Sequence, residues 1–294
     1  MDLTDLLESW QLHLRAERKT PHTVKTYTAG VLTYLDWCDK TGNERVIDRR
    51  QVSQFVVDML DAGAEPASAR SRLTGIRRFS TWLADEGEIP ADPLLGIKPP
   101  KLDVKVTEPL TDDELRAMLK ACQGKHLMDR RDEAVLRLMI EAGIRAGELV
   151  AMTTADIDLP GGLAVVRRGK GGRGRVVPFG PVTAAAIDRY LRLRKGHKHA
   201  SSDTLWLGER GKGFSYASLW KALKGRATAA GVDRFHPHLL RHTAAHRWLA
   251  AGGSDSGLMA VAGWSRPDML LRYTRARASD RAAEEARKLG LGDL

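Results

Sequence analysis

Apolar residues recur at intervals of three and four along residues 1–90, the spacing of helices with one buried face. In the first such stretch these positions include Leu7, Trp10 and Leu14. Thr20 followed by Pro21 is typical of a helix N-cap and its first turn, so a second helix is predicted to begin there. We therefore predict a four-helix domain over residues 1–90, with helices at about 3–17, 20–37, 50–61 and 66–83.

A proline-rich segment, PADPLLGIKPPKLDVKV, interrupts this pattern at residues 90–106. Its four prolines and weak periodicity predict a stiff, extended linker, which we assign to residues 91–106. A new helix is expected just beyond it, because Thr111 and Glu114 have the spacing of a capping box. Residues 107–294 are then predicted to form a second domain.

The second domain mixes helical spacing with two short strand-like runs. Residues 127–151 have helical spacing, with Gly143 near a turn, and the runs LAVVR (163–167) and RVVPF (175–179) predict a β-hairpin with a basic, glycine-rich tip. Further helices are expected near residues 182–195, 215–230, 238–251, 254–263, 267–275 and 279–289. The predicted fold class is mostly α with a small β-sheet, in which a helical N-terminal domain precedes an α+β domain.

The composition is that of a globular protein, with 43% hydrophobic and 29% charged residues. No apolar run approaches the roughly 18 residues of a membrane-spanning helix. The N-terminus lacks the order of a secretory signal, and Cys38 and Cys122 are too few for a disulfide framework. A reducing, cytoplasmic setting is therefore expected.

The net charge of +10 is distributed unevenly. Residues 1–100 contain 13 Lys and Arg against 15 Asp and Glu, a net of −2, whereas residues 101–294 contain 34 against 22, a net of +12. A basic excess confined to one part of a chain indicates a surface for a polyanion such as nucleic acid, although it is also compatible with solubility alone.

Common motifs for nucleotide and metal chemistry are missing. Lys170 lies in GKGG rather than in a phosphate-binding GKS or GKT loop, no HExxH occurs, and no acidic cluster suggests a two-metal nuclease. An enzyme acting on nucleic acid would then use cationic side chains to stabilise charge. We expect neither a metal nor another cofactor.

The segment FHPHLLRHTAAHRWLAAGG, residues 235–253, carries candidate chemistry. His238 and Arg241 lie three residues apart and would share a helix face. A guanidinium that binds phosphate oxygens beside an imidazole that moves a proton suits phosphoryl transfer. Two alternatives stay open: His238, His242 and His246 could bind a metal, or the segment could be an ordinary packed helix.

Two further sets of residues are candidates. Arg145 and Glu148 could be a phosphate-binding arginine with a supporting carboxylate, or a buried ion pair. Tyr273 is surrounded by arginines, and nearby cations favour the phenolate that a nucleophile needs. A tyrosine in a basic helix is, however, more often there for packing.

The order and spacing of six residues resemble the signature of the tyrosine recombinases, the family of phage integrases and Xer proteins: Arg145, Lys170, His238, Arg241, Trp264 and Tyr273. IRAGEL resembles the first-arginine box of that family, and HPHLLRH its His-x-x-Arg box. The resemblance covers nearly the whole chain. It implies a SAM-like, core-type DNA-binding domain at residues 1–90 and a catalytic domain with a C-terminal tail helix at residues 107–294.

The resemblance implies a role for each residue of the signature. Arg145 and Arg241 would bind the scissile phosphate, and Tyr273 would attack it to give a 3′-phosphotyrosine and a free 5′-hydroxyl. Lys170 would protonate the leaving 5′-oxygen. His238 would assist proton transfer.

The supporting residues include one departure from the family pattern. Glu148 would support the arginines, whereas Trp264 occupies a position where most relatives have histidine, although Cre is similar to this chain in having tryptophan. An indole can donate one hydrogen bond but cannot titrate. In the hairpin Lys170 fits the family position best, although Arg173 and Arg175 are further cations of the same segment.

The resemblance also implies double-stranded DNA as substrate and a homotetramer in the synaptic complex, and it leaves open a directionality factor. The basic residues expected to contact DNA are Lys25, Arg70, Arg72, Arg77 and Arg173. The core-binding helices begin at once, so no arm-binding domain is expected, and the tail after Tyr273 is expected to dock on a neighbouring protomer. Phage integration and excision is the predicted role. The alternatives are a Xer-like resolvase, a non-catalytic DNA-binding regulator of the same fold and a metallohydrolase.

Overall fold

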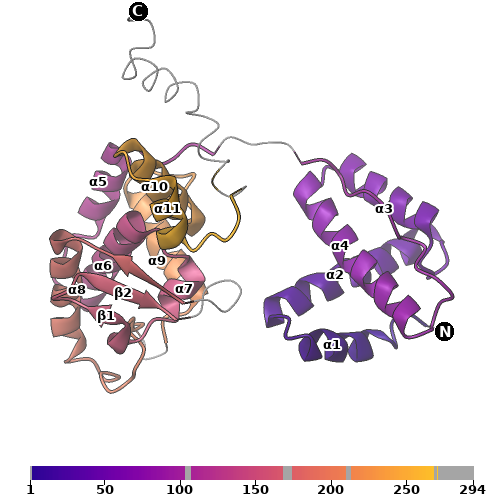
Figure 1. Ribbon diagram of the computed structural model, residues 1–294, viewed down its shortest axis with the longest axis horizontal. Coiled ribbons are helices and arrows are strands. Elements are labelled where there is room, and N and C mark those ends of the chain that lie inside the picture. The colour runs from indigo at the N-terminus through magenta and orange to yellow at the C-terminus, as the bar shows by residue number, and fades with distance from the viewer. Residues whose placement is uncertain (1, 103–106, 168–173, 210–212, 268–269, 271–294) are drawn as a thin grey trace, which may run out of the picture. The chain divides into compact units, whose positions relative to one another are not determined.

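The chain is made of two compact units, Met1–Val106 and Thr107–Leu294, in a computed structural model (Figure 1). The structure describes residues 2–102, 107–167, 174–209, 213–267 and 270. None of the helices within these ranges is long and apolar enough to cross a membrane.

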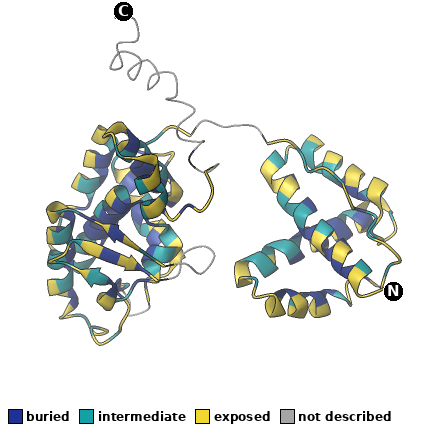
Figure 2. Cartoon of the chain, viewed as in Figure 1, coloured by how far each residue is buried: buried dark blue, intermediate teal, exposed yellow. Residues whose placement is uncertain are grey.

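The first unit contains the four predicted helices: α1 (Leu7–Ala16), α2 (Pro21–Thr41), α3 (Arg49–Asp61) and α4 (Pro66–Asp85). The predicted N-cap is confirmed, because the Thr20 hydroxyl accepts a hydrogen bond from the Thr23 N–H. Helix α1 begins four residues later than expected, because the Asp2 side chain caps a turn by accepting from the Thr4 N–H. The apolar faces of the helices meet in one core, which appears as the dark interior faces in Figure 2.

Helices α2 and α4 cross with their backbones in close contact (Figure 1). A Cβ atom built on Gly30 would lie 2.7 Å from the Arg72 carbonyl oxygen, and one built on Gly75 would lie 2.5 Å from that of Tyr27. Both glycines are therefore needed for this approach, which fixes where the basic face of α4 lies relative to α2.

The second unit is mostly helical, as predicted. Its helices in the described residues are α5 (Asp112–Ala121), α6 (Leu127–Ala142), α7 (Ala146–Val150), α8 (Pro181–Arg194), α9 (Tyr216–Ala229), α10 (Pro237–Ala250) and α11 (Asp255–Ala262). The capping box before α5 is confirmed: the Glu114 N–H donates to the Thr111 hydroxyl, and the Thr111 N–H donates to the Glu114 carboxylate. Helix α6 is the central element and packs against α5, α8, α9 and α10.

A three-stranded antiparallel sheet, in the order β1-β2-β3, accompanies these helices. The predicted hairpin is confirmed as β2 (Leu163–Val166) and β3 (Arg175–Pro178), with Val166 opposite Arg175 at the tip end. Strand β1 (Ile157–Asp158) was not predicted, because two residues are too few to show an alternating pattern.

The helical stretch predicted over residues 127–151, with a turn near Gly143, is confirmed as α6 and α7. Gly143 has a φ of +58°, a left-handed conformation that ends α6, and α7 begins only after Arg145. The break places Arg145 at the N-cap of a new helix rather than inside an old one. The helix predicted at 279–289, and nearly all of the one predicted at 267–275, lie outside the described residues.

Candidate active site

Five of the predicted site residues fall in the described part of the second unit: Arg145, Glu148, His238, Arg241 and Trp264. Lys170, Arg173 and Tyr273 lie outside the described residues, as does the tail that follows Tyr273. The geometry of the site is therefore that of its arginines and of their immediate contacts.

Arg145 is held by the carboxylate that the sequence paired with it. The Arg145 Nη1 donates to Glu148 Oε1 at 2.7 Å, and the Arg145 backbone N–H donates to Glu148 Oε2 at 3.1 Å. The Glu148 side chain is only 6% exposed, whereas that of Arg145 is 27% exposed. The pair is thus oriented from the protein side while the guanidinium remains accessible to a ligand.

Arg241 is more deeply set, at 3% exposure. Its Nη1 donates to the Gly143 carbonyl at 2.8 Å and its Nη2 to the Ala262 carbonyl at 2.7 Å. The guanidinium carbon lies 5.4 Å from the centroid of the Trp264 ring. Arg241 therefore links the break after α6 with the C-terminal end of α11.

The C-terminal end of α11 receives three arginines on three consecutive carbonyls. Arg175 Nε donates to Val261 at 2.7 Å, Arg241 Nη2 donates to Ala262 at 2.7 Å, and Arg145 Nη2 approaches Gly263 at 3.4 Å. The last carbonyls of a helix lack partners within the helix and carry partial negative charge, so cations are favoured there. This helix end is the structural centre of the site.

Arg175 is a site residue that the sequence reasoning did not single out. It was named only as one of several hairpin cations, yet its Nη2 also donates to Glu148 Oε2 at 2.7 Å. The sequence offers no spacing signal for it, because its two partners lie 27 and 86 residues away along the chain. The only signal in the sequence was its position at the start of a predicted strand, next to the basic hairpin tip that carries Lys170.

His238 and Trp264 occupy opposite environments. His238 lies in the first turn of α10 with an exposed side chain, one turn before Arg241, as the helical spacing predicted. Trp264 is buried immediately after Gly263 and packs in a small cluster with Ala245, Leu249 and Leu258. Because it is exposed, His238 could contact a substrate, whereas the buried Trp264 packs against the guanidinium of Arg241.

Electrostatics make the carboxylate of the site an anion and a neighbouring imidazole neutral. Burial alone would raise the pKa of Glu148, but hydrogen bonds from Arg175 and Arg145 hold it below its usual value. For His242, burial, followed by repulsion from His246, lowers the pKa to about 4. His242 is therefore uncharged at neutral pH.

The metal-site alternative receives no support from the geometry. Within the described residues, no group of three or more histidine, cysteine or acidic side chains could hold a metal ion. The tilted rings of His242 and His246 have centroids 4.7 Å apart, and the His238 ring stacks on that of His236 at 6.5 Å.

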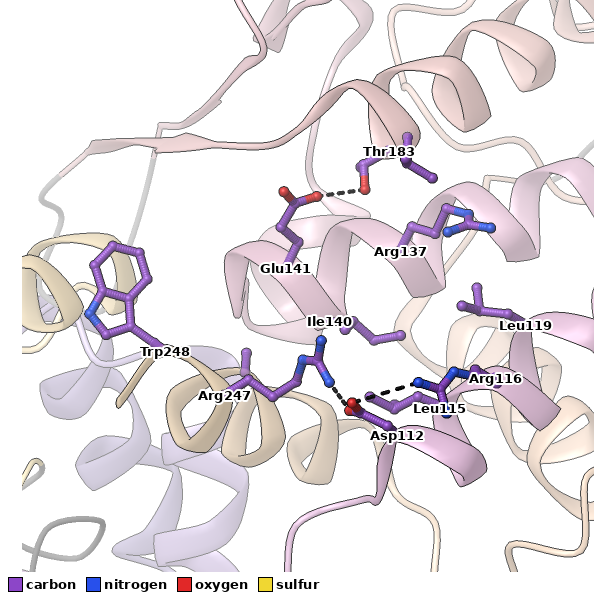
Figure 3. A pocket seen from close by; sticks show the side chains of 12 residues that line it. Asp112, Leu115, Arg116, Leu119, Arg137, Ile140, Glu141, Thr183, Arg247 and Trp248 are labelled. Atoms are coloured by element: carbon purple, nitrogen blue, oxygen red, sulfur yellow. Dashed lines mark hydrogen bonds and ion pairs between the residues drawn. The ribbon is translucent and has the colours of Figure 1, made fainter. Parts of the chain in front are cut away.

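Two hollows lie at or near the described site residues. The hollow lined by Gly143, Arg241 and Ala262 has a volume of about 10 Å³, hardly more than one water molecule. A larger hollow of about 430 Å³ lies between α5, α6, α8 and α10, where Arg247 pairs with Asp112, and no described site residue lines it (Figure 3).

The candidate DNA-contacting residues of the first unit lie on the two crossing helices. Lys25 is on α2, and Arg70, Arg72 and Arg77 are on α4; Lys25 and Arg70 are exposed, and the other two are half-buried. Arg77 and Arg78 both line a hollow of about 260 Å³. Basic side chains are thus available along α4.

Comparison with known proteins places both units in one family. Residues 108–280 match the phage integrase family, and residues 7–87 match the phage integrase N-terminal SAM-like domain. The tyrosine recombinase XerD of Bifidobacterium longum (strain NCC 2705) is 31% identical over 266 residues, which cover 86% of this chain and 86% of that protein.

Solved structures share the fold at lower identity. A Tn1549 transposon integrase in complex with transposon right end DNA has a TM-score of 0.75 and 19% identity, covering 98% of this chain and 99% of that one. A lambda integrase tetramer bound to a Holliday junction has a TM-score of 0.68 and 17% identity, covering 90% and 78%. The chain belongs to the phage integrase family and is a tyrosine-type site-specific DNA recombinase.

Proposed function

We propose that this recombinase cuts and rejoins double-stranded DNA with Tyr273 as nucleophile and with Arg145 and Arg241 as the pair that binds the scissile phosphate. One observation carries the proposal. The two arginines are 96 positions apart in the sequence, yet both donate to the C-terminal end of α11, at Ala262 and Gly263. The α11 end thus fixes two guanidinium groups on the same short stretch of backbone.

The chemistry divides between charge stabilisation and proton transfer. Two guanidinium groups would bind the non-bridging oxygens and offset the charge that develops during in-line displacement. The Tyr273 oxygen would form a bond to phosphorus while the bond to the 5′-oxygen breaks. His238 would accept the tyrosine proton, and Lys170 would protonate the 5′-oxygen; Lys170 and Tyr273 are assigned by the family resemblance.

The environments of the histidines favour His238 over its neighbours as the proton-transfer group. His238 is exposed at the start of α10, so it can meet a substrate directly. His242 is partly buried, and a pKa of about 4 makes it a poor base near neutral pH. Trp264 would hold Arg241 from beneath and cannot exchange protons.

Rejoining would need no external energy source. The phosphotyrosine ester retains the energy of the cleaved bond, so attack by a second 5′-hydroxyl restores the DNA backbone. The reaction would take place between DNA duplexes held by four copies of the chain, as in the solved lambda integrase tetramer. The basic residues of α2 and α4 would contact the DNA backbone of each site.

The biological role divides into two candidates. Phage integration and excision joins two different attachment sites, whereas a Xer-like resolvase joins two copies of one site; either would act in the bacterial cytoplasm. A recombination assay with identical and with non-identical site pairs from the source genome separates the two roles by which pair recombines.

The nucleophile is tested by covalent trapping. A duplex carrying the recombination site and a nick beside the cleavage point loses a short fragment on cleavage, which prevents religation. The wild-type chain should form an SDS-resistant adduct in EDTA, and Tyr273→Phe should form none. An equal adduct with the phenylalanine variant would show that another residue is the nucleophile, and tight binding without an adduct would indicate a DNA-binding regulator.

A further inference from the structure

Arg175 enters the site from the hairpin. It is the first residue of β3, paired with Val166 of β2, and so lies at the base of the segment that carries Lys170. Its side chain is only 9% exposed. A buried guanidinium is retained only where its donors find partners.

The partners of Arg175 all belong to the site. Nη2 donates to Glu148 Oε2 and Nε donates to the Val261 carbonyl, each at 2.7 Å. The side chain also lies flat against the turn that follows α11: a Cβ atom built on Gly263 would be 3.1 Å from its Cδ and Nη1 atoms. One side chain thus joins the hairpin, the arginine box and the helix end.

Glu148 is divided between its two arginines. Oε1 accepts from Arg145 Nη1, while Oε2 accepts from Arg175 Nη2 and from the Arg145 backbone N–H. Without Arg175, Oε2 loses a charged donor, and the carboxylate can turn to bind the guanidinium of Arg145 with both oxygens. Arg145 would then be drawn towards the protein and away from a ligand.

We propose that Arg175 is a positioning residue for DNA cleavage, acting through Glu148 and the end of α11 to hold Arg145 in its phosphate-binding geometry. The inference rests on the proposed function, because it assumes that Arg145 binds the scissile phosphate. It does not require Arg175 to touch DNA. A guanidinium is needed because only its planar fork reaches a carboxylate and a carbonyl at once; a lysine has a single nitrogen.

The hairpin supplies a matched control. Arg167 directly follows β2, on the other side of the hairpin tip from Arg175. It pairs with Asp156, outside the arginine site. Its side chain is 62% exposed. Arg167→Lys therefore makes the same chemical change in the same hairpin, and the cleavage rate should stay within about twofold of wild type because lysine keeps a charged donor beside the buried Asp156, outside the arginine site.

The test is a double-mutant cycle on the full-length chain. Arg175→Lys, Glu148→Gln and the double variant are compared with wild type in single-turnover adduct formation on the nicked duplex, at saturating DNA. Each single change should lower the rate roughly tenfold to hundredfold, as changes behind a functional side chain commonly do. The double variant should be no slower than the slower single variant, because both changes break one link.

The proposal would be overturned if the fold losses of the two single variants multiplied in the double variant. It would also be overturned if Arg175→Lys cleaved at the wild-type rate, or if Arg167→Lys lost as much activity as Arg175→Lys. Thermal melting establishes that each variant is folded, and Arg175→Gln replaces the lysine variant if that one melts early. Absence of an adduct with wild type would overturn the proposed function as well. If wild type forms the adduct and Arg175→Lys forms it at the same rate, only the positioning role would be overturned.

A second substrate separates the arginine site from the hairpin lysine. When sulfur replaces the leaving 5′-oxygen, departure needs no proton donor, because the pKa of a thiol is only about 8.5. The defect of Arg175→Lys should persist on this substrate, since Arg145 must still bind the phosphate. A defect that disappears would show that Arg175 acts through Lys170 instead.

Discussion

Among the described residues of the second unit, two arginine–carboxylate networks differ in charge balance. The balanced network consists of Asp129, Arg131, Asp132 and Arg226, in which two carboxylates meet two guanidinium groups through hydrogen bonds of 2.7–3.0 Å. It ties α6 to α9. Arg131 and Asp132 are both about 4% exposed, so the ion pair at the centre of this network is buried.

The site network consists of Arg145, Glu148, Arg175 and Arg241. Here three guanidinium groups accompany one carboxylate, and backbone carbonyls at the end of α11 take the place of further acids. A carbonyl satisfies an N–H donor without neutralising its charge. The comparison teaches how a chain can order several arginines and still leave positive charge for a phosphate.

The largest effect is expected on cleavage when the site network loses Arg241. Arg241→Ala should lower the single-turnover cleavage rate roughly hundredfold to thousandfold, as loss of one charge-stabilising donor commonly does. Arg226→Ala in the balanced network is the control: it should lower the melting temperature but leave the rate per folded molecule close to wild type. Equal rate losses in the two variants would remove the distinction between the networks.

Breaking the balanced network should act on stability instead. Asp132→Ala leaves the buried Arg131 without its carboxylate, which should lower the free energy of unfolding by about 3–5 kcal/mol. Asp188→Ala, which removes an exposed pair with Arg192, should cost at most about 1 kcal/mol. Denaturant unfolding measures both, and similar small costs would mean that the buried network is not structural.

A smaller effect is expected where the site network meets the backbone. Gly143→Ala places a side chain in a left-handed conformation, with its Cβ 3.3 Å from that of Ala244, and should cost about 1–2 kcal/mol. It should also slow cleavage, because the Gly143 carbonyl holds Arg241. Gly231→Ala, left-handed but with open space around it, is the control that should lose stability alone.

The last effect concerns pH. His242 has a pKa of about 4 in the folded chain against about 6.5 when unfolded, through burial and repulsion from His246, His238 and His236. The unfolded chain therefore binds more protons between these values, so the contribution of His242 to stability is complete above pH 6.5 and declines towards pH 4. His242→Gln should lose less stability than wild type across this window, and parallel pH curves would contradict the assignment.

Local signals in the sequence predicted most helices and the hairpin. Thr20 and Thr111 marked helix starts because capping depends on residues three positions apart. Gly143 marked the turn between α6 and α7, although the sequence does not show that this glycine adopts a left-handed φ. The two-residue β1 leaves no period to detect.

The candidate site was only partly predictable, because some of its contacts join neighbours in the sequence and others join residues far apart. Arg145 with Glu148, and His238 with Arg241, are neighbours on single helical turns, so spacing alone paired them. Arg175 was missed because its partners are a carboxylate on another helix and a backbone carbonyl of α11. Backbone acceptors carry no residue identity, so no sequence pattern marks them.

The central claim is that Arg145 and Arg241 act on the charge of the scissile phosphate, and a neutral phosphate tests it most directly. Replacing one non-bridging oxygen with a methyl group removes the charge that these arginines would offset. On this DNA the Arg145→Ala and Arg241→Ala variants should recover much of their lost cleavage relative to ordinary DNA. Variants that remain equally defective on both substrates would contradict the account.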